Sequence, residues 1–272
     1  MVQVHSDYPD GYHVTIFLKN ALVELGATVT FDDDRLHGCE GFVVNGVPVA
    51  WLLDNRVPAN REWQDPAAAA MLQAGNVIVC HCQKEDAERV GGRWLPIAAT
   101  PRFQRNPKRK PTYDGAFVGY LKDQNRLAVI QGLASEYNLN IKSKVFYEDA
   151  AAVYHSAKVG VNVPAFYKHP RNIDYDINMR TFEVMASGVP LVTAYNPALA
   201  DLGIHSGVNC LTYDNPDELH HILKWVIDDD QLLEDIAING WELVQRRHTY
   251  KHRAEQVLEW VAEWQTSQLQ PE

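Results

Sequence analysis

The chain has 272 residues, 46% of them hydrophobic, and a formal net charge of −10. This length suits two domains of about 100 to 150 residues, each with a full core, while the acidic balance argues against binding nucleic acid or anionic membrane through the whole surface. No apolar stretch is long enough to span a bilayer, and four cysteines are too few for a disulfide scaffold, so we expect a cytoplasmic protein with reduced thiols.

The first half alternates short apolar runs with helical patterns, which predicts an α/β domain with a parallel sheet. The predicted strands cover about residues 2–5, 27–31, 47–53, 76–80 and 93–97, and the predicted helices residues 12–25 and 66–74. A run rich in arginine, lysine and proline follows at 101–112. We interpret it as a solvated linker between a domain of residues 1–100 and a domain of residues 113–272, and a contact with a phosphate-bearing acceptor is the alternative.

The second half repeats the alternation and predicts a second α/β domain. Its predicted strands cover about residues 115–119, 141–145, 159–163, 189–194 and 210–213, and its predicted helices residues 125–137, 149–156, 178–188, 216–228, 231–245 and 250–265. Ligands of open α/β sheets bind outside the carboxyl ends of the strands. The two halves therefore predict two Rossmann-like domains that face a cleft.

The helix predicted at 178–188 carries the most informative motif of the chain. Arg180 and Glu183 lie three residues apart and share one face of the helix. Asn178 suits the N-cap position, the backbone N–H groups at this end attract phosphate, and Gly188 suits the left-handed position that ends a helix. This pattern is typical of a nucleoside diphosphate site, with Arg180 and the N–H groups for the pyrophosphate and Glu183 for the ribose hydroxyls. A structural helix with an exposed ion pair is the alternative.

Five segments match, in the same order, segments of one enzyme family. They are residues 95–99, 113–119, 154–162, 178–188 and 248–254. Together they resemble the C-terminal domain of GT-B glycosyltransferases, most closely the CgeB-like (spore-maturation-protein-like) group of the group 1 glycosyltransferases. The resemblance implies a hexosyltransferase whose co-substrate is a nucleoside-diphosphate sugar, preferentially a UDP-hexose. It implies no required cofactor or metal, a donor site on the C-terminal domain, and a last helix that packs back toward the N-terminal domain.

The resemblance also implies a set of donor-binding residues. Gly119 permits a close backbone approach at a phosphate turn, and Lys122 or Arg126 supplies charge to the leaving diphosphate. Tyr147 and Glu148 lie near the base by analogy. The signature helix contributes Asn178, Met179, Arg180, Thr181 and Glu183.

The acceptor side depends on the first half, where the match is weaker. Residues 8–13 resemble the first loop of GT-B enzymes, so that His13 would face the cleft and deprotonate an acceptor hydroxyl in an inverting enzyme. A structural role at the helix start is the alternative. Asp54 follows a predicted strand and would orient His13 or act itself, and these two residues and Arg180 are the catalytic candidates. Tyr175 stands where many retaining relatives carry a glutamate, which leaves the stereochemical outcome open.

Other interpretations stay open beside this one. The acidic cluster at 32–34 would suit the metal site of a GT-A glycosyltransferase, although such clusters after strands are usually solvated turns. A metal cluster of His37, Cys39, Cys80, His81 and Cys82 is disfavoured by its spacing. A non-catalytic nucleotide-sugar-binding protein and a nucleotide-sugar epimerase would use the same donor site. The acceptor is a glycan, a protein, a small molecule or a modified DNA base.

Overall fold

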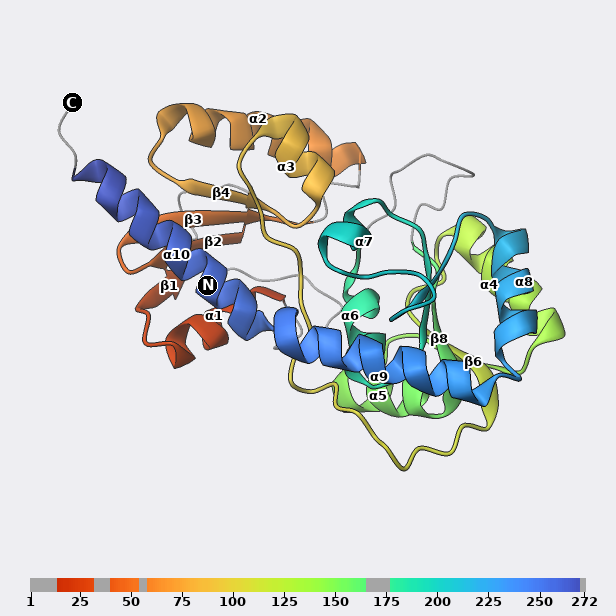
Figure 1. The fold of residues 1–272 in the computed structure, drawn as a ribbon. Helices are drawn as coiled ribbons and strands as arrows, with labels where there is room; N and C mark the ends of the chain where they lie inside the picture. The colour runs from red at the N-terminus through yellow and green to blue at the C-terminus, as the bar shows by residue number, and fades with distance from the viewer. Residues whose placement is uncertain (1–13, 32–39, 54–57, 165–176, 270–272) are drawn as a thin grey trace. The chain divides into compact units, whose positions relative to one another are not determined.

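The computed structural model describes residues 14–31, 40–53, 58–164 and 177–269 (Figure 1). The chain divides into two compact units. The first consists of Met1–Ile97 together with Tyr250–Glu272, and the second of Ala98–Thr249. The C-terminal helix therefore belongs to the first unit, and the arginine-rich and proline-rich segment belongs to the second. Within the described ranges, no helix is both long enough and apolar enough to cross a membrane.

The first unit contains a five-stranded sheet in the order β1-β2-β3-β4-β5. Its strands are β1 (Val29–Phe31), β2 (Glu40–Val44), β3 (Val47–Leu52), β4 (Ile78–His81) and β5 (Arg93–Trp94). Strands β3, β4 and β5 are parallel, as predicted, whereas β1, β2 and β3 pair antiparallel. The prediction of a parallel sheet is therefore wrong for this edge, and it omits β2.

The antiparallel edge follows from a tight turn between β2 and β3. Asn45 and Gly46 have φ angles of 50° and 83°, and a two-residue hairpin of type I′ requires such left-handed values at both positions. Asn-Gly is the pair that adopts them most readily. The Asn45 side-chain oxygen also accepts a hydrogen bond from the N–H of Thr28 at 2.9 Å. The turn thus reverses the chain and is tied to the residue that precedes β1.

Four helices cover the described part of the first unit. They are α1 (Val14–Glu24), α2 (Pro58–Ala74), α3 (Lys84–Val90) and α10 (Tyr250–Gln268). Helix α10 packs along α1, where the rings of Phe17 and Tyr250 lie 5.5 Å apart (Figure 1). The buried guanidinium of Arg253 donates to the carbonyl of Pro96 at 2.7 Å, and its burial lowers the pKa of Arg253 to about 10. These contacts hold the last helix on the first unit, as the resemblance implies.

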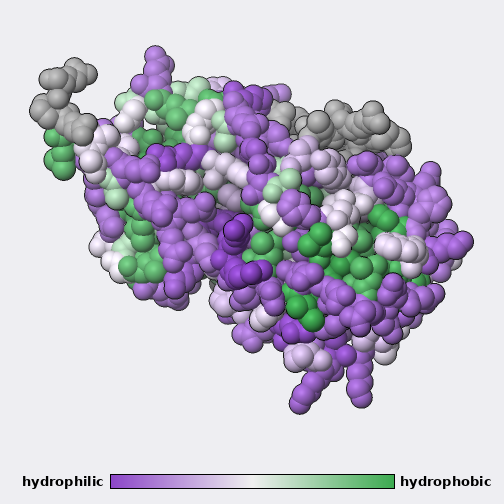
Figure 2. All heavy atoms as spheres, in the orientation of Figure 1, coloured by the Kyte–Doolittle hydropathy of each residue, from purple (hydrophilic) through white to green (hydrophobic). Residues whose placement is uncertain are grey.

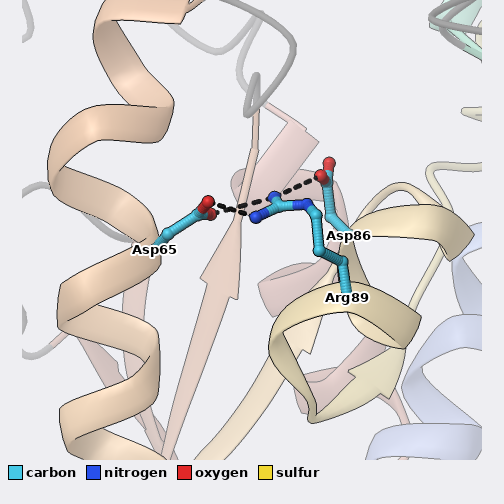
Figure 3. Close-up of polar contacts among 3 residues, drawn as sticks. All are labelled: Asp65, Asp86 and Arg89. Carbon is cyan, nitrogen blue, oxygen red and sulfur yellow. Dashed lines mark hydrogen bonds and ion pairs between the residues drawn. The ribbon is translucent and has the colours of Figure 1, made fainter.

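Arg89 of α3 joins two acidic side chains of the first unit (Figure 3). Its guanidinium makes a two-pronged contact with the carboxylate of Asp65 on α2, and its Nη2 lies 2.8 Å from Oδ1 of Asp86. The carboxylate of Asp86 is buried. The hydrogen bond with Asp65 raises the pKa of Arg89 above its ordinary value, so the guanidinium stays charged. The network ties α2 to α3 and compensates the buried charge of Asp86.

Replacing Arg89 by methionine should lower the free energy of unfolding by about 1–3 kcal/mol, because Asp86 would keep a buried carboxylate and lose the cation that compensates it. Urea-induced unfolding followed by circular dichroism measures the change. Arg93→Met is the matched control, because its ion pair with Glu263 is exposed and exposed pairs contribute about 0–1 kcal/mol. Equal losses in the two variants would contradict this role of the buried network.

The second unit contains a five-stranded parallel sheet in the order β10-β9-β8-β6-β7. Its strands are β6 (Tyr113–Val118), β7 (Leu139–Lys142), β8 (Ala157–Asn162), β9 (Leu191–Ala194) and β10 (Leu211–Tyr213). The first strand of this unit, β6, lies between β7 and β8. The strand order therefore reverses between β6 and β8, and a reversal of this kind creates a crevice at the carboxyl ends of the two strands.

Helices cover this sheet and complete the α/β architecture. They are α4 (Gln124–Glu136), α5 (Tyr147–His155), α6 (Met179–Ala186), α7 (Ala198–Asp201), α8 (Pro216–Val226) and α9 (Asp230–Arg247). The core joins Phe117 and Val161 of the sheet to Leu223 of α8 and Ile236 of α9. Hydrophilic residues cover most of the face that Figure 2 shows, and hydrophobic residues reach it in patches. The second unit is thus a Rossmann-like α/β domain, as predicted.

The arginine-rich and proline-rich segment packs against the second unit. Its arginines at 102, 105 and 109 find partners there: the Glu148 carboxylate at 3.5 Å, the Glu234 carboxylate at 2.8 Å and the Ala157 carbonyl at 2.6 Å, respectively. Phe103, which lies between Arg102 and Arg105 in the sequence, has a buried ring. These three arginines therefore have partners in the second unit, whereas most residues of 101–112 are exposed.

Candidate functional site

Helix α6 begins where the sequence predicts, and it presents its motif beside the end of β8. The side-chain oxygen of Asn178 accepts a hydrogen bond from the N–H of Arg180 at 3.0 Å, so Asn178 is the predicted N-cap. Its Nδ2 donates to Oδ1 of Asn162, the last residue of β8, at 3.2 Å. Gly188 has a φ of 65° and ends the helix in the predicted left-handed conformation. The cap therefore fastens the helix start to the carboxyl edge of the sheet.

The guanidinium of Arg180 bridges the two strand ends at which the order of the sheet reverses. Its Nε donates to the carbonyl of Val118, the last residue of β6, at 2.5 Å, and its Nη1 donates to Oδ1 of Asn162 at 2.6 Å. The same guanidinium lies 5.0 Å from the centre of the Phe117 ring. Arg180 thus places a fixed positive charge at the crevice that the strand order creates.

Gly119 follows β6 and makes room for this arginine. A Cβ atom at this position would lie 2.5 Å from Nη2 of Arg180 and 3.0 Å from the Phe117 ring. The sequence interpretation explains Gly119 by a close approach of backbone to phosphate. In the structure the Arg180 guanidinium occupies the adjacent space, so the absence of a side chain at Gly119 also makes room for the arginine.

Helix α6 lies close to the sheet because β8 has a glycine beneath it. A Cβ atom at Gly160 would lie 2.5 Å from Cγ1 of Val184 on α6. Val184 itself is fully buried. The close approach of this helix and strand sets the height of the motif above the sheet.

Glu183 lies one turn after Arg180 and is buried, with 7% of its surface exposed. The hydroxyl of Tyr154 on α5, itself fully buried, lies 3.5 Å from Oε2 of Glu183. The alternative of an exposed ion pair on a structural helix is therefore wrong for Glu183. A buried carboxylate beside a fixed cation is the kind of arrangement that serves a binding site.

The other predicted cations differ in their surroundings. Arg126 on α4 is buried, donates to the carbonyl of Tyr120 at 2.9 Å and lies 5.8 Å from the Phe117 ring. Arg126 and Arg180 therefore both flank Phe117. Lys122 is exposed and lies 5.9 Å from the Tyr120 ring. The structure thus brings Gly119, Arg126 and Arg180 together around one aromatic ring.

Tyr147 and Glu148 begin α5, after a loop at the carboxyl end of β7. Tyr147 has a φ of 50° and Lys144 a φ of 58°, and left-handed angles at residues other than glycine often mark functional loops. Arg102 stacks on the Tyr147 ring at 4.3 Å and pairs with Glu148. Burial raises the pKa of Tyr147, and Arg102 acts in the opposite direction.

Thr181 and Met179 complete the motif at the start of α6. Thr181 is buried, and its hydroxyl lies 3.3 Å from Nδ2 of Asn162, so it helps to attach the helix to β8. Met179 is half-buried. Sequence reasoning gave no role to Asn162, Tyr154 or Arg102. The polar Asn162 at the end of an apolar strand is a usable signal for the first of these, whereas the other two depend on contacts distant in sequence.

Several predicted residues lie outside the part of the chain that the structure describes. These are His13, Asp54, Tyr175, His37, Cys39 and the acidic cluster at 32–34. Cys80 and Cys82 are buried free thiols, and burial raises the pKa of Cys80 to about 12. Among the described residues, no three metal-ligating side chains come together.

The sequence model of a family described as glycosyl transferase-like matches residues 101–259, more than half of the chain. The chain belongs to the glycosyl transferase-like family. No curated protein sequence gives a significant match.

Solved structures show that this family member has a known fold. The sucrose-phosphate synthase of Thermosynechococcus elongatus is 16% identical with a TM-score of 0.57, and the match covers 78% of this chain and 65% of that one. HepE of Anabaena, in complex with UDP-glucose, is 15% identical with a TM-score of 0.57, and the match covers 79% of this chain and 72% of that one. The chain thus spans less than two thirds of the length of the synthase. The likeness confirms the predicted GT-B class of fold.

Gly160→Ala should destabilise the second unit by about 1–3 kcal/mol, because the added methyl group forces α6 away from β8. Thermal unfolding measures the loss. Gly132→Ala is the matched control: it lies within α4, its Cβ would meet its nearest neighbour at 3.6 Å, and alanine favours a helix by about 1 kcal/mol over glycine. A stable Gly160→Ala variant would contradict the tight contact of α6 with the sheet.

Proposed function

We propose that the chain is a GT-B glycosyltransferase that transfers a hexose from a nucleoside-diphosphate sugar, preferentially a UDP-hexose, to a hydroxyl acceptor. One observation carries the proposal: the Arg180 guanidinium spans the reversal point of the second sheet, and the buried Glu183 carboxylate follows one turn later on the same helix. In this proposal the diphosphate lies at the start of α6 beside Arg180, and the ribose hydroxyls lie on Glu183.

The electrostatics of this helix end support the assignment of the diphosphate. The N-terminus of a helix carries a partial positive charge that favours phosphate, and Arg180 adds a full charge in a fixed orientation. A preorganised cation of this kind stabilises charge that develops on a leaving group. Transfer then forms a bond between the acceptor oxygen and the anomeric carbon, breaks the bond from that carbon to the diphosphate, and releases UDP with the bonding electrons.

The acceptor hydroxyl also loses a proton in this reaction. We assign the proton to His13 with Asp54 as its partner, the residues that the sequence places at the acceptor side, and both lie outside the described residues. The acceptor is a glycan, a protein, a small molecule or a modified DNA base. Tyr147 and Glu148 are proposed to lie near the base of the donor, and Lys122 and Arg126 to add positive charge near the diphosphate.

The choice of donor and of subgroup draws on the resemblance and on the comparisons. HepE is known in complex with UDP-glucose and with UDP and glucose, which supports a UDP-linked hexose as the first donor to test. The ordered motifs favour the CgeB-like group. The free thiols of Cys80, Cys82 and Cys210 suit a reducing compartment, and the cytoplasm is the proposed location.

Glu183→Gln should weaken UDP binding by about tenfold to a hundredfold, because hydrogen bonds to a charged group contribute about 1.5–3 kcal/mol. Arg180→Ala should lower the turnover of donor hydrolysis by about a hundredfold or more, and raise KM by a smaller factor. Isothermal titration with UDP and a donor-hydrolysis assay with UDP-glucose measure these effects. Arg180→Lys, which keeps the charge and loses the two-pronged geometry, should fall between wild type and Arg180→Ala.

Glu242→Gln and Arg246→Ala are the matched controls, because these residues form an exposed pair within α9, and both should behave as wild type. Unchanged UDP affinity in Glu183→Gln would refute the donor site. UDP binding without turnover against any acceptor would instead favour a non-catalytic nucleotide-sugar-binding protein. Interconversion of the donor sugar without a mass change of an acceptor would favour an epimerase.

Turnover should persist when divalent cations are removed, because Arg180 and the helix start supply the positive charge that a metal would otherwise provide. The measurement is donor hydrolysis after dialysis against EDTA, with and without added Mg²⁺ or Mn²⁺. Loss of activity in EDTA that either cation restores would contradict metal-independent transfer.

A further inference from the structure

Tyr154 is a fully buried tyrosine whose hydroxyl faces the two charged groups of α6. The hydroxyl lies 3.5 Å from Oε2 of Glu183. Burial, followed by the negative charge of Glu183, raises the pKa of Tyr154 well above its ordinary value, and the positive charge of Arg180 acts in the opposite direction. The phenol therefore stays protonated at neutral pH, and it can donate a hydrogen bond to the carboxylate.

The arginine-rich and proline-rich segment contacts α5 at Tyr154 and at the next residue. The buried ring of Phe103 lies 6.3 Å from that of Tyr154. The next residue of α5, His155, lies with its Nε2 3.1 Å from the Gln104 carbonyl and 3.0 Å from the Ser187 carbonyl. The segment and the end of α6 are thus both attached to α5 at Tyr154 and His155.

Building on the proposed function, we propose that Tyr154 is a positioning residue that orients the Glu183 carboxylate toward the ribose hydroxyls of the nucleotide donor. A carboxylate has two oxygens and about four sites that accept hydrogen bonds. The Tyr154 hydroxyl occupies one site on Oε2 and limits rotation of the carboxylate. In this proposal the ribose hydroxyls bind to the same carboxylate, which the Tyr154 hydroxyl orients before the donor binds.

This role predicts an effect that depends on the ribose hydroxyls. Tyr154→Phe keeps the ring and its packing on Phe103, and it removes the hydroxyl alone. It should weaken UDP binding by about threefold to tenfold, the range expected for one hydrogen bond. Binding of 2′,3′-dideoxy-UDP, which lacks both hydroxyls, should be the same in the variant and in wild type. Isothermal titration with these two nucleotides measures both effects.

Tyr137→Phe is the matched control. Its hydroxyl also makes a hydrogen bond within the second unit, to the carbonyl of His220 on α8 at 3.0 Å, and its removal should leave the affinities for both nucleotides unchanged.

The double variant Tyr154→Phe with Glu183→Gln should bind UDP no more weakly than Glu183→Gln alone, because Tyr154 acts through the carboxylate. A second variant, Phe103→Leu, weakens the packing against the Tyr154 ring and keeps the hydroxyl. It should lower the affinity for UDP by a smaller factor than Tyr154→Phe and leave the affinity for 2′,3′-dideoxy-UDP unchanged.

The outcomes separate this inference from the proposed function. If Glu183→Gln leaves UDP affinity unchanged, the donor site itself is refuted. If Glu183→Gln weakens UDP binding but Tyr154→Phe does not, the site stands and the positioning role is overturned. Equal losses of UDP and dideoxy-UDP affinity in Tyr154→Phe would also overturn it, because they would indicate a general change of structure. Should Tyr154→Phe not fold, the comparison of the two nucleotides in Phe103→Leu decides the matter in the same way.

Discussion

The bridge from Arg180 to Val118 and Asn162 is the interaction on which the candidate site depends. It joins the start of α6 to two neighbouring strands at the one place where the strand order of the second sheet reverses. An arginine suits this place because its planar guanidinium donates in several fixed directions and stays charged when partly buried. The orientation of the positive charge is therefore fixed by a backbone carbonyl and a side-chain oxygen at the two strand ends, without a bound ligand.

The cost of this design lies in the polar groups buried around it. Glu183 and Tyr154 are both buried next to Arg180, and polar groups in such positions contribute less to stability than apolar side chains of similar size. Proteins commonly retain arrangements of this kind where a ligand needs preorganised partners. The close contact of Gly160 with Val184 has a similar cost. The sheet has no side chain at position 160 to add to its packing, and this absence lets α6 approach.

Local signals in the sequence predict much of this structure, and contacts between distant residues account for what they miss. Asn178 and Gly188 mark both ends of α6 because each favours a particular backbone conformation. The Asn45-Gly46 pair is an equally local signal, and it indicates a hairpin. A prediction made from the general alternation of strands and helices does not use this signal and therefore misses β2. The contact of Glu183 with Tyr154 could not be predicted, because the two residues lie 29 positions apart in the chain. The partner of Arg105 in the basic segment is likewise distant, because it is a glutamate 129 residues away.

The contact between Gly119 and Arg180 also bears on how this site can change in evolution. A side chain at position 119 and an arginine at position 180 compete for the same volume, since even a Cβ atom would lie 2.5 Å from the guanidinium. A residue larger than glycine at position 119 would displace the guanidinium, and a smaller residue at position 180 would remove the positive charge. Relatives that carry a larger residue at position 119 should therefore carry a smaller one at position 180 and draw the charge for the diphosphate from another element. The two positions therefore share one small volume of the site, although 61 residues separate them in the chain.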